Sequence, residues 1–403
     1  MRLNLTVLFF ASLAALALLA SVGCGNSGCP NNGSGGTGTG SGTSSGTTVT
    51  STCGGSGGGG GTTSGSVFVY YVDGNGAIQG ADLSTSGTLA AFTNYTAPSQ
   101  TFTDAESMVI VNNAYLYVPQ KSASDIRVYS INRDNGALSE ISGSPFSTSG
   151  GDTVASDPLG RFLFLTDSAG GGVSVFQISS STGGLTQTSG SPFASPVVFG
   201  WFPAVDGAGK YLYIAQNDPA LPTAGFSFDQ SSGALTAVPG SPLSLAVSAV
   251  RPESSGAYMV GATGDLTDFH LYLFSIESGT GVLAAVPGSP FTTQSAPYNY
   301  SMSPVAPFVY SFGVDSTGAA QAPEGYTINL SSGTLTAVSG SPFTSLPAVD
   351  VCGFDPSGVY MFCPEGTTSI AIFTANTTTG GLSSTVTPLT VNMGSNIVFA
   401  AMD

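Results

Sequence analysis

The chain has 403 residues, of which only 7% are charged, and it carries a formal net charge of −16. Seven lysines and arginines cannot form the basic surface that displaces counterions from nucleic acid, so the composition argues against a nucleic-acid-binding protein. An anionic substrate would also have to be held by very few cations.

The N-terminal residues have the features of an export signal. Arg2 precedes an apolar core from Leu5 to Ala20, and the small residues just before Cys24 resemble a bacterial lipobox. We predict a lipoprotein signal peptide over residues 1–23 and lipidation of the Cys24 thiol; an ordinary signal peptide or a single anchor helix is the alternative. Because Gly25 rather than Asp follows the cysteine, we expect a lipid-anchored protein of the cell envelope, at the outer membrane or cell surface.

A tether follows the proposed lipid site. Residues 25–66 are almost entirely Gly, Ser and Thr, with no apolar periodicity that could bury surface and offset the entropy of ordering. Cys29 and Cys53 lie within this stretch and are either paired or free. The predicted organisation is therefore a signal peptide (1–23), a lipidated flexible linker (24–66) and a folded domain (67–403).

The folded domain contains a repeat of two sequence patterns in fixed phase. A Gly-x-Leu pattern recurs with a spacing of about 47 to 52 residues, and its leucines are Leu89, Leu138, Leu185, Leu235, Leu283, Leu335 and Leu382. Gly-Ser-Pro followed by Phe or Leu comes after five of these, ending at Phe146, Phe193, Leu243, Phe291 and Phe343. We predict turns with an aromatic plug between repeats at these five positions, and no binding role for them.

Each repeat reads as short strands rather than helices. Runs of aromatic and branched residues predict strands, in chain order, at Val67–Val72, Arg161–Thr166, Val173–Ser179, Lys210–Ala215, Leu271–Ile276, Pro307–Ser311, Val359–Cys363 and Ser369–Phe373. The segments Asp157-Pro-Leu-Gly160 and Asp355-Pro-Ser-Gly358 predict tight turns. No apolar stripe with a 3.6-residue period is sustained, so helix should be minor.

Four strands in each of seven repeats predict an all-β, seven-bladed β-propeller with four-stranded blades. The final segment, Asn396–Asp403, matches the inner strand expected at Thr153–Asp157. We expect it to complete the blade that Val67–Val72 begins, which closes the ring and removes a free sheet edge. An open β-solenoid or two smaller sandwiches is the rival architecture.

The repeat resembles that of a known group of propellers. Tyr129–Phe146 (YSINRDNGALSEISGSPF) and Asp157–Asp167 (DPLGRFLFLTD) resemble the repeat of the lactonase-type seven-bladed propellers, which include 6-phosphogluconolactonase-like proteins and YVTN-repeat surface proteins. The resemblance covers essentially all of 67–403 and implies the fold, while the same blade serves both enzymes and binding scaffolds. It also implies that members acting on lactones gather His, Glu and Arg near the mouth of the central channel.

Only a few residues of this sequence meet that expectation. The family's Pro-Arg-His cluster is absent, and its nearest counterpart is Arg251-Pro252 at the end of an inner strand. Arg251 is a candidate ligand-binding cation, with a salt bridge or blade-to-blade hydrogen bonds as the alternative. His270, the single histidine, follows Asp265 and Asp268 and is a candidate catalytic imidazole, or else a lone exposed side chain at a strand edge. Trp201 is a candidate stacking platform for a sugar, or a packed blade aromatic.

The remaining candidates concern cysteines and metals. Cys352 and Cys363 flank the turn at Asp355–Gly358 on adjacent strands, and the sequence leaves open a disulfide or two buried thiols. The acidic turn at Asp73 lacks the ladder of acidic residues that a calcium loop needs, and no CxxC pair offers a zinc site. We expect no metal and no cofactor.

These observations leave two functional hypotheses. The first is a monomeric, lipid-anchored envelope propeller that acts as a binding scaffold for a glycan, peptide or protein ligand, because titratable groups are scarce and the loops are rich in Ser and Thr. The alternative is a lactone hydrolase resembling 6-phosphogluconolactonase. Whether the chain is an enzyme stays open on the sequence alone.

Overall fold

The computed structural model describes residues 67–402, except 85–87, 93–95, 103, 152, 168–170, 198–199, 201, 385–387 and 394–398. The predicted signal peptide, Cys24 and the tether with Cys29 and Cys53 lie outside the described residues. Within the described ranges every regular element is a β-strand. No helix in that part of the chain is long and apolar enough to cross a membrane.

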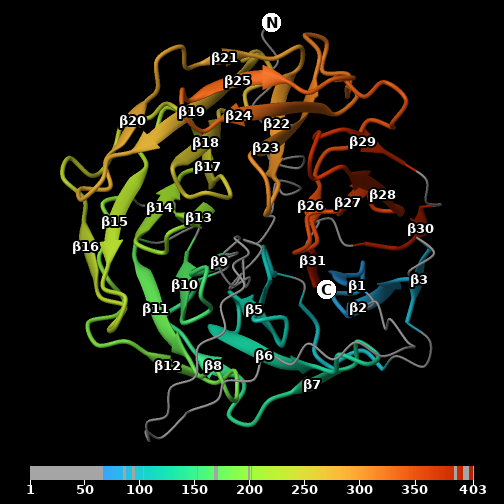
Figure 1. Cartoon of the computed structure of the whole chain (residues 1–403). Coiled ribbons are helices and arrows are strands. Elements are labelled where there is room, and N and C mark those ends of the chain that lie inside the picture. Colours follow the sequence, from blue (N-terminus) through green and yellow to red (C-terminus); the bar gives the residue numbers. More distant parts are fainter. Residues whose placement is uncertain are drawn as a thin grey trace, which may run out of the picture. The chain divides into compact units, whose positions relative to one another are not determined.

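The strands form seven antiparallel sheets, each built around a path of four strands (Figure 1). We number these blades from one to seven, starting with the blade that contains the first strand. The innermost strands, in order of blade, are β31 (Phe399–Met402), β4 (Val109–Val111), β9 (Thr153–Ser156), β13 (Phe202–Val205), β17 (Ala249–Pro252), β22 (Ala296–Met302) and β26 (Gly353–Phe354). The second strands are β1 (Val67–Val72), β5 (Tyr115–Gln120), β10 (Phe162–Thr166), β14 (Tyr211–Ala215), β18 (Tyr258–Ala262), β23 (Phe308–Val314) and β27 (Tyr360–Glu365).

The two outer positions of each blade follow the same order. The third strands are β2 (Ile78–Leu83), β6 (Asp125–Ile131), β11 (Val173–Ile178), β15 (Ala224–Phe228), β19 (His270–Ile276), β24 (Glu324–Asn329) and β28 (Ser369–Ala375). The outermost strands are β3 (Leu89–Ala91), β7 (Leu138–Glu140), β12 (Leu185–Gln187), β16 (Leu235–Ala237), β20 (Leu283–Ala285), β25 (Thr334–Ala337) and β29 (Leu382–Ser383). In three blades a short extra strand also pairs with the third strand, which the sequence did not predict. These extra strands are β8 (Phe146–Ser147), β21 (Phe291–Thr292) and β30 (Leu389–Thr390).

The ring is closed within blade one. Strand β31, at the C-terminal end of the described chain, lies beside β1 (Figure 1). The two strands pair antiparallel, with Phe68 opposite Met402 and Tyr71 opposite Phe399. Strand β31 also contacts β4 of blade two and β26 of blade seven. The predicted seven-bladed, four-stranded all-β propeller is therefore confirmed.

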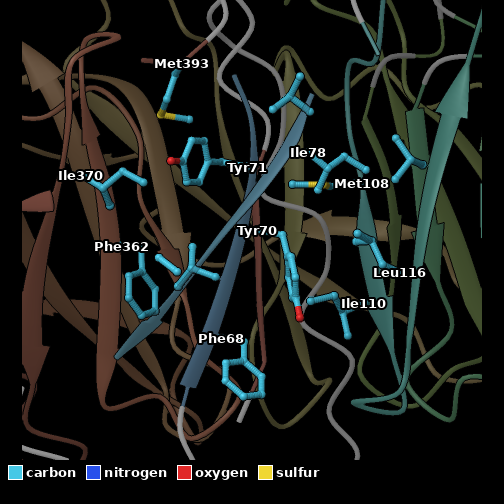
Figure 2. Close-up of a cluster of buried hydrophobic side chains, with 14 of the residues drawn as sticks. Phe68, Tyr70, Tyr71, Ile78, Met108, Ile110, Leu116, Phe362, Ile370 and Met393 are labelled. Carbon is cyan, nitrogen blue, oxygen red and sulfur yellow. The ribbon is translucent and has the colours of Figure 1, made fainter. Parts of the chain in front are cut away.

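Apolar cores fill the spaces between blades, because each blade buries both of its faces. Strand β1 shows how alternation achieves this: Tyr70 and Tyr71 are neighbours in sequence but point to opposite sides of the strand (Figure 2). The cluster drawn there joins Phe362 and Ile370 of blade seven to Ile110 of blade two through blade one. Since β1 is buried along its whole length, it reads as a continuous apolar run.

A repeated hydrogen bond ties neighbouring blades together. The hydroxyl of a tyrosine on the second strand donates to the carbonyl oxygen of the Gly-x-Leu glycine in the next blade. The pairs are Tyr70 with Gly136, Tyr117 with Gly183, Tyr213 with Gly281, and Tyr310 with Gly380, at 2.7 to 2.9 Å. The glycine itself has a positive φ, +70° at Gly136, which explains why this position of the repeat is glycine.

Loss of one such hydroxyl should measurably weaken the ring. Tyr213 is fully buried, so Tyr213→Phe leaves the Gly281 carbonyl without its donor, and we expect a loss of about 1–2 kcal/mol in the free energy of unfolding. Tyr115→Phe is the matched control, because the bond from Tyr115 to the Ser181 carbonyl is exposed. Chemical denaturation of the two variants beside the parent chain provides the measurement, and equal losses would contradict the role assigned to burial.

The Gly-Ser-Pro segments have a structural function. In all five, the serine hydroxyl accepts the backbone N–H of the residue 16 positions earlier on the third strand, as Ser144 does for Val128 at 3.0 Å. The residue after the proline packs into a core between blades, as Phe146 does in the cluster that blades two and three share. These contacts agree with the predicted aromatic plug.

Candidate functional site

A single cation lies where the innermost strands of blades five and six approach each other. Arg251 of β17 donates from Nη1 to the carbonyl oxygen of Tyr300 at 2.6 Å, and from Nη2 to Asn299 Oδ1 at 3.1 Å. Its guanidinium carbon lies 4.9 Å from the centroid of the Tyr300 ring, a cation–π distance. Arg251 thus makes blade-to-blade hydrogen bonds, which was one of the two alternatives left open by the sequence.

The backbone around Arg251 is arranged to hold the guanidinium in one orientation. Strand β22 changes register between Pro297 and Asn299, and such a bulge re-aims the side chains beside it. Asn299, which is buried, accepts both the Tyr300 backbone N–H at 2.8 Å and Arg251 Nη2. The Tyr300 hydroxyl donates to the carbonyl oxygen of Val260, the residue paired with Arg251 across the sheet. We call Arg251, Asn299 and Tyr300 the Arg251 cradle.

The electrostatics of the cradle are unusual for so acidic a protein. Among the described residues no carboxylate forms an ion pair with Arg251, whereas Lys121, Arg127 and Arg161 each pair with an Asp or Glu at 3.0 Å or less. Burial lowers the pKa of Arg251, and burial likewise raises the pKa of Tyr300, so the phenol stays neutral. Arginine keeps its charge at physiological pH, and the cradle therefore presents a positive charge with no counter-ion from the described chain.

His270 occupies a different place. It begins β19, the third strand of blade five, and its Nδ1 lies 2.6 Å from Asp268 Oδ1. The second oxygen of Asp268 accepts the hydroxyls of Thr263 and Tyr272, at 2.9 and 3.0 Å. His270 is thus hydrogen-bonded to Asp268 and not to Asp265, and its catalytic role stays a prediction. Among the described residues, no hydrogen bond or ion pair links His270 or Asp268 to the Arg251 cradle.

The other sequence candidates have mixed outcomes. Trp201 lies outside the described residues. Cys352 and Cys363 are bonded to each other and fully buried, and the disulfide links the residue just before β26 to β27. In the described part of the chain no three His, Cys, Asp or Glu side chains group as metal ligands. Asp73 is engaged in its own turn, where it accepts the N–H groups of Asn75 and Ala77.

Glu324, at the start of β24, is one of the buried carboxylates that the sequence analysis did not single out. It accepts the N–H groups of Gln294 and Ser295 at 2.9 and 2.8 Å, and also the hydroxyls of Ser295 and Tyr326. With both oxygens engaged, Glu324 fixes the connection between blades five and six and is not set up as a base. Asn299 and Tyr300 were missed as well, because no local pattern marks the bulge that brings them to Arg251.

One protein-family model matches part of the chain. Residues 64–201 match the family model described as lactonase, 7-bladed beta-propeller. Over these residues the match confirms the resemblance that the repeat indicated, and the seven sheets show the seven-bladed β-propeller fold. No curated protein matches the chain.

Solved structures of three bacterial proteins share the fold. A candidate 6-phosphogluconolactonase from Bacteroides fragilis aligns with a TM-score of 0.62 at 15% identity, over 85% of this chain and 99% of its own. A second candidate 6-phosphogluconolactonase, from Bacteroides uniformis, gives 0.61 at 16% identity over 83% and 99%. The periplasmic gluconolactonase of Pseudomonas aeruginosa gives 0.53 at 15% identity over 83% and 99%. At these identities the likeness concerns the fold.

Proposed function

We propose that this protein is a lactone hydrolase, with the Arg251 cradle as the site that holds the reacting carbonyl. The observation that carries the proposal is a positively charged side chain on an innermost strand, with no counter-ion among the described residues, in a propeller whose residues 64–201 match the lactonase model. The gluconolactonase from Pseudomonas aeruginosa shares this architecture and supports the same reaction class.

The chemistry asked of the cradle is electrostatic. Water adds to the lactone carbonyl carbon and gives a tetrahedral oxyanion, while the proton of the water passes to solvent. The ring C–O bond then breaks, its electron pair goes to the leaving alkoxide, and that alkoxide takes a proton to give the hydroxy acid, which ionises. A guanidinium already held by Asn299 and Tyr300 can donate to the oxyanion without reorganising.

An assay of the purified full chain on a panel of aldonolactones tests the proposal, with acid release measured above the spontaneous rate. Removal of one oxyanion donor typically costs about 10²–10³ in rate, so Arg251→Gln should lower kcat/KM by about that factor. Arg133→Gln is the control, because Arg133 bonds to the backbone carbonyls of Asn112 and Asn113, away from the cradle. His270→Ala should leave the rate unchanged. A chain that hydrolyses no lactone, or a folded Arg251→Gln variant as fast as the parent, would refute the proposal.

A non-catalytic binding scaffold for a glycan, peptide or protein is the second candidate function. The observation in its favour is that the described residues bring no histidine or carboxylate into contact with the cradle to act as a base. Glycan arrays and pull-downs from envelope extract test this reading. Ligand capture without any lactone turnover would select it over the hydrolase.

Anchorage in the cell envelope through Cys24 is a separate proposal. A buried disulfide in the propeller supports export, because such bonds persist in oxidising compartments. In cells fed labelled palmitate, we expect the full chain to carry label and to sediment with membranes, and Cys24→Ala to lose the label. A labelled Cys24→Ala variant would show that the lipid is attached elsewhere.

A further inference from the structure

The distribution of cations narrows the ligand that the Arg251 cradle can accept. All 23 Asp and Glu residues lie within 67–403, whereas one of the seven Lys and Arg residues, Arg2, belongs to the predicted signal peptide. Six cations therefore remain in a strongly acidic propeller. A ligand with two negative charges would approach it against a repulsive field.

The other five cations are placed where they cannot assist Arg251. Lys121, Arg127 and Arg161 are each neutralised by a carboxylate. Arg133 donates to backbone carbonyls in the turn between β4 and β5, and Lys210 is exposed in the turn between β13 and β14. Among the described residues, none of these five side chains forms a hydrogen bond or ion pair with the cradle.

The surroundings of the cradle add negative charge rather than positive charge. Tyr298 stands on β22, beside the bulge that carries Asn299, and its pKa is raised by burial and by the charge of Asp350. A phosphate ester is a dianion near neutral pH and is bound in proteins by several donors or cations together. Such a second cation is missing from the described residues around Arg251.

The guanidinium is suited to a single planar anion. Of its five N–H donors, Tyr300 and Asn299 use one each, and the Tyr300 ring centroid lies 4.9 Å from the guanidinium carbon. The remaining donors match the two oxygens of one carboxylate, or the one oxygen of a lactone carbonyl. Placing a monoanion there supplies the missing counter-charge of a partly buried arginine.

We propose that the Arg251 cradle is selective for unphosphorylated ligands: it takes an uncharged sugar lactone and its monoanionic hydroxy-acid product, and it rejects the phosphorylated forms. The turnover part of this inference rests on the proposed function, whereas the binding part does not. Binding of a hydroxy-acid carboxylate at Arg251 can therefore be tested even if the protein hydrolyses nothing.

The binding experiment uses calorimetry on the full chain with gluconate, 6-phosphogluconate and inorganic phosphate. We expect gluconate to bind, Arg251→Gln to weaken it at least tenfold, Arg251→Lys to restore it only in part, and Arg133→Gln to leave it unchanged. 6-Phosphogluconate should bind at least tenfold more weakly than gluconate, and higher salt should narrow that gap because salt screens repulsion. Tighter binding of 6-phosphogluconate or of inorganic phosphate, or gluconate binding that survives Arg251→Gln, would overturn the inference.

The kinetic experiment separates this inference from the proposed function. With gluconolactone and 6-phosphogluconolactone as substrates, kcat/KM should favour the unphosphorylated lactone by at least about tenfold. Equal rates, or a preference for the phosphorylated substrate, would overturn the selectivity while leaving lactone hydrolysis standing. If neither lactone is turned over but gluconate binds through Arg251, the hydrolase proposal fails and the selective carboxylate site stands.

Discussion

Deletion of residues 394–403 is expected to prevent the propeller from folding stably. Strand β31 supplies the innermost strand of blade one, and four of its residues pair with β1. At roughly 1 kcal/mol for each ladder hydrogen bond, the lost pairing alone costs about 4 kcal/mol. The deletion also uncovers a strand edge and the apolar cluster around β1, which invites association with other chains. We expect most of the protein to become insoluble, and any soluble fraction to unfold at a much lower temperature.

A deletion of equal length in the tether, residues 51–60, is the matched control for that experiment. This deletion removes the same number of residues, all of them outside the described propeller. It should leave the unfolding temperature unchanged. Solubility, size-exclusion profile and thermal unfolding of the two variants are the measurements. A truncated protein that stays monomeric and melts with the parent would show that blade one does not need its C-terminal strand.

Removal of the disulfide should give the second-largest loss of stability. Cys352 and Cys363 are separated by 11 residues, and a crosslink closing a loop of that size stabilises the native state by about 3 kcal/mol. Its position matters, because β26 has only two residues, Gly353 and Phe354, to hold the inner edge of blade seven. We expect Cys352→Ser with Cys363→Ser to lower the free energy of unfolding by about 3 kcal/mol.

Two comparisons isolate the effect of this disulfide. Cys29→Ser with Cys53→Ser alters cysteines outside the described propeller and should leave its stability unchanged. A reducing agent should shift the unfolding midpoint of the parent chain and of that control, but not the midpoint of the Cys352→Ser, Cys363→Ser variant. A parent chain that is insensitive to reduction, with Cys352 and Cys363 titrating as free thiols, would contradict the prediction.

Most of the fold could be predicted from the sequence because the turns of each blade need particular residue types, and these recur with the repeat. Gly136 and Gly281 recur because their turns need a positive φ and because each glycine carbonyl accepts a tyrosine hydroxyl from the preceding blade. Likewise, Asp157 recurs in the tight turn because its carboxylate accepts the N–H groups of Arg161 and Phe162. Because these requirements are local, they appear as recurring residues in a single sequence.

The candidate site was only partly predictable, because its geometry depends on contacts between blades. Arg251 was singled out because Arg251-Pro252 is the nearest counterpart of the cluster that the family resemblance implies. Its partners Asn299 and Tyr300 come from the next blade and depend on a bulge with no sequence signal. The disulfide was undecided for a similar reason: strand register decides whether two cysteines face each other. The observed pairing of Gly353 with Phe362 sets Cys352 beside Cys363.

Closure of the ring inside a blade means that the order of the strands along the chain is not fixed by the fold. Because Phe68 and Met402 stand opposite each other on paired strands, a short peptide could join them. New ends could then be opened in an exposed turn such as Thr317–Gly318, giving a circularly permuted chain with the same seven sheets. In such a molecule blade one would be continuous, and another blade would be made from both ends of the polypeptide.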